Sequence, residues 1–168
     1  MNRNSAWVIL SVAFVAVWWA NSLPPVKRTA KTTVSEASCN EVPISSGVYQ
    51  DFSAHEAIAP LRVVTTSKNS YFVKLADYNS HQTVMTFFVY GGIPEEVLVP
   101  LGTYSLRYAY GNKWCGESQL FGDNTQYGEA DSKFEFRNNG GSVSGYTVEL
   151  IERQHGNLRT KSIPANSF

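Results

Sequence analysis

Apolar and polar residues alternate along several short stretches of the chain after residue 60. From Tyr104 to Tyr110, three Tyr residues and one Leu fall on one face of the predicted strand, and Ser, Arg and Ala fall on the other. Residues 133–137 and 146–150 alternate in the same way, and residues 71–75 do so more loosely. A period of two residues predicts β-strands that bury one face.

Residues 83–90 read TVMTFFVY and are apolar on both faces. A strand of this kind is buried on both sides, so we expect it in the middle of a sheet. Gly91-Gly92 follows it directly and predicts a turn at its end.

Two further turn segments predict hairpins in the last third of the chain. Residues 138–141 (Asn-Asn-Gly-Gly) separate two alternating stretches, and these residue types tolerate the positive φ of a hairpin loop. Gly156-Asn157 predicts a two-residue turn between strands at 146–154 and 158–163. Consecutive hairpins imply a mostly antiparallel meander or Greek key.

These features predict an all-β fold, an antiparallel β-sandwich or open barrel of about nine strands, preceded by one N-terminal hydrophobic helix. Residues 1–25 form the hydrophobic segment in this interpretation. Residues 26–46 are rich in Thr, Ser, Lys and Ala without a period, and predict a flexible linker. Residues 47–168 form the β-sandwich domain.

The hydrophobic segment at residues 6–20 reads AWVILSVAFVAVWWA and carries no charge. Fifteen helical residues span about 22 Å, which is short of the roughly 30 Å of a bilayer core, and Pro24 ends the helix. A cleaved signal peptide and an uncut signal anchor both fit this segment. The anchor is favoured, because Trp18 and Trp19 crowd the cleavage region and suit a membrane interface.

The charges around the segment leave its orientation open. Lys27, Arg28 and Lys31 follow it and outnumber Arg3 before it, which favours a cytoplasmic domain under the positive-inside rule. A short N-terminal hydrophobic segment is also typical of exported proteins, which favours a domain outside the cytoplasm. We expect a domain facing the periplasm or exterior, with a cytoplasm-facing domain or secretion after cleavage as alternatives.

The charge balance and the motifs predict neither a nucleic-acid-binding protein nor an enzyme. Lys plus Arg and Asp plus Glu are both 14, so no net positive potential would attract phosphates. The sequence has no nucleophile elbow, P-loop or metal-ligand His spacing. We therefore expect no cofactor and no metal, and we expect the histidines and the acidic residues of 123–131 to be solvated.

Cys39 and Cys115 are the two cysteines, and their spacing matches neither a zinc nor a redox motif. Two unpaired thiols are the simplest interpretation. If the domain is exported, the two residues could instead form one disulfide that closes a long segment of chain.

The segment from Asn112 to Tyr127 is the most suggestive for binding. It carries Trp114, Phe121 and Tyr127 among glycines and polar residues. Exposed aromatic side chains beside polar groups form sugar and peptide sites and interface hot spots. The commoner interpretation is that Trp114 and Phe121 fold inward and close one end of the sandwich.

Two stretches resemble known proteins. Residues 96–104, with a Pro-x-Gly turn at residues 100–102 between two strand candidates, resemble the repeat core of PEGA-type and Cna-B-type β-sandwich modules. A longer set of positions resembles a group of small bacterial membrane-anchored proteins that carry no assigned activity: Gly111, Trp114, Gly116, Glu117, Leu120, Phe121, Gly122, Thr125, Tyr127, Gly145, Thr147, Glu149, Leu150, Gly156, Asn157, Leu158 and Ile163.

The second resemblance covers roughly residues 59–168 and implies a bacterial origin and a β-rich fold. Cys115 stands where that group suggests an aromatic residue, so the cysteine is not a general requirement of the fold. We expect a non-catalytic binding or assembly module at the cell envelope, held to the membrane by its N-terminal segment and bound to a protein partner. A small-ligand receptor, for example for glycan, that uses the Trp114 segment is the alternative.

Overall fold

The structure is a computed structural model that describes residues 39–150 and 159–168. All of them belong to one compact unit, Ser35–Phe168. The predicted hydrophobic helix and the predicted turn at Gly156-Asn157 lie outside the described residues. Within the described residues, no helix has the length and apolar character needed to cross a membrane.

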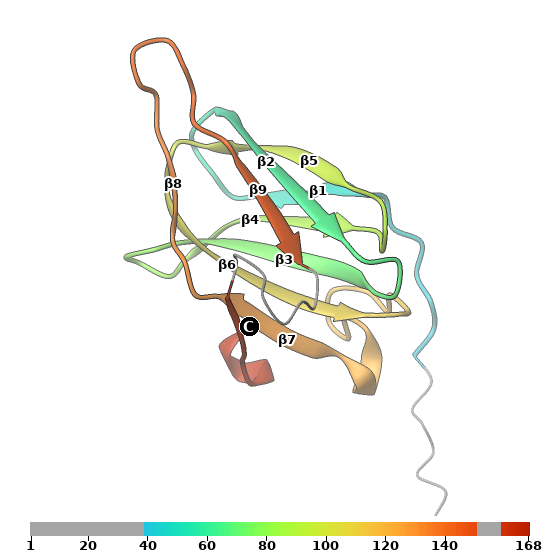
Figure 1. Cartoon of the computed structure of the whole chain (residues 1–168). Helices are drawn as coiled ribbons and strands as arrows, with labels where there is room; N and C mark the ends of the chain where they lie inside the picture. The colour runs from blue at the N-terminus through green and yellow to red at the C-terminus, as the bar shows by residue number, and fades with distance from the viewer. Residues whose placement is uncertain (1–38, 151–158) are drawn as a thin grey trace, which may run out of the picture. The chain divides into compact units, whose positions relative to one another are not determined.

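The described residues form ten β-strands and two short 3-10 helices (Figure 1). In chain order they are β1 (Gly47–Asp51), β2 (Ala57–Thr65), β3 (Ser70–Asp77), β4 (Thr83–Val89), β5 (Glu95–Pro100), β6 (Gly102–Gly111), η1 (Gly122–Asn124), β7 (Gln126–Ala130), β8 (Phe134–Phe136), β9 (Tyr146–Leu150), β10 (Thr160–Ser162) and η2 (Ala165–Ser167).

The strands make two sheets of unequal width. The seven-stranded sheet has the order β1-β4-β3-β6-β7-β10, and β8 pairs with β6 beside this path. The three-stranded sheet has the order β5-β2-β9. Every pairing is antiparallel except β2 with β9, which is parallel. The all-β class and the sandwich are thereby confirmed, and the sheets do not close into a barrel.

The core between the sheets follows the alternation in the sequence. Leu106 of β6 and Val148 of β9 are fully or almost fully buried in it, while Arg107 points to the opposite face and is half-buried. The face assignment of β6 is therefore confirmed. Removing the inward-facing apolar side chains from water stabilises the fold by about 25 cal/mol for each Å² buried.

The strand that is apolar on both faces lies inside the larger sheet, between β1 and β3. Its Met85 and Phe87 belong to the core between the sheets, and its Phe88 belongs to a second cluster on the outer face. Phe72 and Ala109 join Phe88 in this outer cluster. The prediction of a central strand is confirmed, because a second apolar layer covers the side of the sheet that would otherwise face water.

The predicted hairpin of residues 146–154 with 158–163 is wrong. β9 pairs with β2 in the smaller sheet, whereas β10 pairs with β7 in the larger one. Alternation shows which face of a strand is buried, but it does not show which strand lies beside it. Parallel pairing with β2 buries Val148 and Leu150 in the core without a hairpin partner.

The chain also changes sheets at three other expected turns, including Gly91-Gly92 between β4 of the larger sheet and β5 of the smaller one. Around residues 138–141 the hairpin is reduced to one bridge, Asn138 with Val143, since β8 pairs with β6 and β9 with β2. The Pro-x-Gly turn at residues 100–102 leads from β5 in the smaller sheet to β6 in the larger one. Turn residues at all three places therefore close the sandwich rather than join neighbouring strands.

Candidate functional site

The loop between β6 and β7 carries the aromatic residues that the sequence suggests for binding. Trp114 and Phe121 are each only 5% exposed. The Trp114 ring lies 5.0 Å from the ring of Phe72 and 5.4 Å from that of Phe88, measured between centroids. Trp114 is therefore part of the outer cluster, and the exposed recognition surface expected at Trp114 and Phe121 is not there. They cover a face of the larger sheet rather than an end of the sandwich.

The sequence of this loop brings its aromatic side chains down onto the sheet. Leu120 has a φ of 51°, and its N–H donates to the Gly116 carbonyl at 2.7 Å, which turns the chain back over β6. Phe121 then lies directly on Gly111, where an added Cβ would come within 2.5 Å of the Phe121 Cβ. Glycine at 111 is required for this close approach, because any larger residue would lift Phe121 off the sheet.

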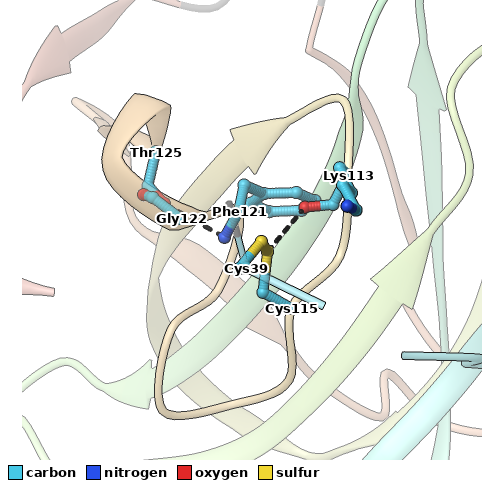
Figure 2. Close-up of a disulfide and its surroundings, with 6 residues drawn as sticks. All are labelled: Cys39, Lys113, Cys115, Phe121, Gly122 and Thr125. Atoms are coloured by element: carbon cyan, nitrogen blue, oxygen red, sulfur yellow. Dashed lines mark hydrogen bonds between the residues drawn. A yellow bond between two sulfur atoms is a disulfide. The ribbon is translucent and has the colours of Figure 1, made fainter. Parts of the chain in front are cut away.

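Cys39 and Cys115 are joined in a disulfide, with their Cα atoms 5.7 Å apart (Figure 2). The bond replaces the two unpaired thiols that the spacing suggested, and it connects positions separated by 76 residues in the sequence. It lies beside Phe121 and Gly122 in Figure 2. The disulfide therefore attaches the chain before β1 to the loop that covers the outer cluster.

Residues 39–46, which we call the N-terminal strap, lie against this loop and the edge of the larger sheet. The Val42 N–H donates to the Trp114 carbonyl at 2.9 Å, and the Tyr90 hydroxyl donates to the Ile44 carbonyl. The Ser46 hydroxyl donates to the Phe88 carbonyl at 3.2 Å. The described part of the expected linker is thus held by the domain, which extends at least to Cys39.

Tyr127, the third predicted binding residue, is half-buried at the far side of the outer cluster. Its ring lies 5.4 Å from the ring of Phe168. Lys74 lies 4.2 Å from the centroid of the same Phe168 ring and donates to the Phe168 carbonyl at 3.3 Å. Burial lowers the pKa of Lys74, against an opposing effect of Glu117. The structure places all three predicted residues in one packed cluster.

A charged group occupies the outer face next to this cluster. Arg107 Nε and Lys161 Nζ each lie 3.0 Å from a different carboxylate oxygen of Glu129. Burial by itself would raise the pKa of Glu129, but the hydrogen bonds and charges of Arg107 and Lys161 outweigh it and hold the pKa below its usual value. Glu129 on β7 thus forms ion pairs with Arg107 on β6 and with Lys161 on β10.

The remaining polar candidates do not converge. Within the described residues, no group of three or more His, Cys, Asp or Glu side chains is placed to hold a metal ion. His55 and His81 are exposed in turns, and His155 lies outside the described residues. The Asp77 carboxylate accepts hydrogen bonds from the Ser80 N–H at 2.8 Å and hydroxyl at 2.9 Å, which lower its pKa, and so serves the turn after β3.

A pocket on the inner face of the larger sheet is the candidate site that sequence reasoning missed. Its volume is about 190 Å³, and its lining comprises Tyr71, Tyr108, Tyr110, Tyr127, Gly128, Glu149, Leu150, Thr160, Lys161 and Ser162. Its lining comes from β3, β6, β7 and β10 of the larger sheet and from the C-terminal end of β9. Figure 1 shows β7 below β3 and β6, at the lower edge of the view.

Three tyrosines border the pocket from the core side: Tyr71 and Tyr108 are buried in the core between the sheets, and Tyr110 is half-buried beside it. The rings of Tyr71 and Tyr110 are stacked with centroids 5.4 Å apart, and Tyr108 lies 5.9 Å from each of them. The Tyr71 hydroxyl donates to the Leu150 carbonyl at 3.1 Å, and the Tyr110 hydroxyl donates to Gln126 Oε1 at 2.7 Å. The alternation of Tyr along β6 is the only sequence signal for this pocket, but the same alternation is typical of a strand face that is buried in the core.

No family model matches the chain, and comparison with curated proteins and with solved structures found no similar protein. The function must therefore be argued from the site itself.

Proposed function

We propose that this protein is a non-catalytic binding or assembly module of the bacterial cell envelope, exported and held to the membrane through its N-terminal segment. The observation that carries the proposal is the disulfide between Cys39 and Cys115. Structural disulfides persist in oxidising compartments and are rare in the bacterial cytosol. The bond thus supports export over the cytoplasmic orientation that the flanking charges favour.

The position of the disulfide supports a displayed domain. It joins the last described residues before β1 to the loop over the outer cluster, and the strap adds hydrogen bonds to Trp114 and Tyr90. The segment that precedes the domain is therefore attached to it at Cys39, on the outer face of the larger sheet. The inner-face pocket remains away from that attachment, because it lies on the opposite face of the same sheet.

The pocket supports a small-ligand receptor as the second candidate function, at a different place from the one expected. Small-molecule sites are concave and combine aromatic walls with a few polar groups. The half-buried Tyr110 borders the pocket, and Thr160 and Ser162 supply hydroxyl groups at the rim.

Thiol trapping in intact cells of the source bacterium tests the proposal. Free thiols are blocked with a membrane-permeable maleimide before lysis, and a second maleimide of larger mass is added after reduction. Cys39 and Cys115 should accept the second reagent and not the first. A Cys39→Ser variant supplies the control, since its remaining thiol should accept the first reagent. Blocking of both native thiols before reduction would reject export.

A further inference from the structure

The loop between β8 and β9 carries the one Asn-Gly pair of the sequence, Asn139-Gly140. In Figure 1 this loop extends beyond the ends of the sheets. Both residues are exposed, and a Cβ added at Gly140 would have no atom within 4 Å. The space around the pair is therefore unobstructed.

An unobstructed Asn-Gly pair can undergo an intramolecular reaction with its own backbone. The Gly140 nitrogen forms a bond to Asn139 Cγ, and the bond between Cγ and Nδ2 breaks. Nδ2 leaves as ammonia with the proton of the Gly140 nitrogen, and a cyclic succinimide remains. Addition of a water molecule opens the succinimide to aspartate or to isoaspartate, so water is the only co-reactant. Glycine hinders the attack least, because it has no Cβ.

The hydrogen bonds of the loop hold its turn without engaging the reacting atoms. The Asn139 N–H donates to the Ser142 carbonyl at 2.9 Å, and the Gly141 N–H donates to Asn138 Oδ1 at 3.1 Å. Within residues 39–150 and 159–168, neither the Asn139 side-chain amide nor the Gly140 N–H makes a hydrogen bond. The Gly140 nitrogen is thus free to act as the nucleophile.

The other described asparagines lack this combination. Four of them are each followed by an N–H that donates a hydrogen bond within the protein: Asn79, Asn124, Asn138 and Asn166. The Ser80 N–H, for example, donates to Asp77 Oδ1 at 2.8 Å. Three more are followed by a residue that carries a side chain: Asn40, Asn69 and Asn112. Among the asparagines that the structure describes, Asn139 alone precedes a glycine whose N–H is unbonded.

We propose that Asn139 is a spontaneous deamidation site, at which the folded protein converts asparagine to isoaspartate and aspartate. The change adds a negative charge to a chain whose formal net charge is zero. Isoaspartate also carries the chain through its side-chain carbon, which lengthens the turn between Asn139 and Ser142. Because water is the only co-reactant, the modified fraction grows with the age of the protein. The site is independent of the proposed binding function.

Peptide mapping of the aged protein tests the assignment. The full chain in detergent is kept at physiological temperature in mildly alkaline buffer, and samples taken over days are digested with trypsin. The peptide that begins after Arg137 holds both Asn138 and Asn139. Mass spectrometry should show the gain that accompanies replacement of an amide by a carboxyl group at Asn139 and not at Asn138. Unchanged mass at Asn139, or equal conversion of Asn138, would overturn the assignment.

Two further measurements identify the reaction. Electron-transfer fragmentation and labelling by an isoaspartyl methyltransferase should both detect isoaspartate, which only the succinimide route produces. Conversion should be slower in mildly acidic buffer, because the attacking nitrogen must lose its proton. Conversion to aspartate without isoaspartate would indicate direct hydrolysis of the amide and would reject the role of the Gly140 nitrogen.

Matched variants and a peptide locate the site and test the effect of the fold. Asn139→Gln should abolish the isoaspartate signal, and Gly140→Ala should slow its formation about tenfold or more, since a Cβ hinders the attack. Asn79→Gln removes an asparagine whose neighbouring N–H is bonded and should change nothing. A synthetic peptide of residues 135–145 should react at a rate close to that of the folded chain. A folded chain more than about tenfold slower than the peptide would show that the loop protects Asn139, and would overturn the inference.

Discussion

The larger sheet carries an aromatic cluster on each of its faces, and the two differ in what covers them. On the outer face, Trp114 and Phe121 fold onto Phe72 and Phe88, and the disulfide and the strap secure the covering loop. On the inner face, the tyrosines of β3 and β6 lie at the margin of the core beside a pocket, with Tyr71 and Tyr108 buried and Tyr110 half-buried. Aromatic composition alone therefore does not show how deeply a ring is buried, because burial depends on which segments cover each face of the sheet.

The two clusters also differ in the polarity of their aromatic residues. The outer one is built from Phe and Trp around Ala109, which suits a dry interface. The inner wall consists of tyrosines, which have a hydroxyl to satisfy at the margin of the core. Tyr71 and Tyr110 do so with acceptors of the protein itself.

The largest loss of stability is expected from a charge placed in the core between the two sheets. Leu106→Asp should unfold the domain, because an unpaired carboxylate would be buried between the sheets at a cost of about 5 kcal/mol or more. Circular dichroism and near-UV spectra of the variant check this. Arg107→Ala, one residue away on the outer face, should cost about 1 kcal/mol or less. Equal tolerance at the two positions would contradict the assignment of faces.

Trp114→Ala should sharpen the comparison by removing the centre of the outer cluster. Truncation of a buried Trp typically costs about 3–5 kcal/mol, so the free energy of unfolding in urea should fall by that amount. In a chain whose Trp7, Trp18 and Trp19 are replaced by Phe, emission from Trp114 should be blue-shifted and poorly quenched by acrylamide. Red-shifted, readily quenched emission would restore the loop as an exposed site.

Breaking the disulfide should loosen the outer cover and leave the pocket in place. The loop-entropy model gives about 4.5 kcal/mol for a crosslink between positions 76 residues apart, and Cys39→Ser with Cys115→Ser should lose about this stability. Amide exchange should rise in the strap and in the loop around Trp114. Unchanged exchange there, with increased exchange at Tyr108 and Tyr110 instead, would show that the faces are not independent.

The sequence identifies the strands better than their neighbours. Alternation places Leu106 and Val148 in the core, and the two apolar faces of residues 83–90 indicate a central strand, because burial is a local property of each face. The parallel pairing of β9 with β2 and the crossing of sheets at Leu101 depend on contacts between distant segments, which no local pattern records.

The site is less predictable for the same reason. Trp114 and Phe121 could be exposed or buried until the sheet beneath them was known. The three pocket tyrosines look like core residues because their strands alternate as core strands do. Tyr71 and Tyr108 are core residues, and Tyr110 is half-buried beside the pocket, whose place depends on where β9 and β10 lie.

The smallest effect is expected from Glu129, which lies on the outer face of β7 next to the pocket residue Gly128. Its pKa is held below the usual value by Arg107 and Lys161, so its contribution to stability is fully present above the pKa of the unfolded chain and is lost as the pH falls through the folded pKa. The loss should begin near pH 5, since an unperturbed Glu titrates at about 4.3. For a partly exposed ion pair it should amount to about 0.2–1 kcal/mol. Urea unfolding at pH 7 and pH 3 measures this loss of stability.

Control variants assign the pH dependence to Glu129. Glu129→Gln should remove this part of the pH dependence, and Arg107→Gln should remove most of it. The double variant should lose less stability than the sum of the two single variants. A pH dependence that Glu129→Gln leaves unchanged would show that another carboxylate carries it.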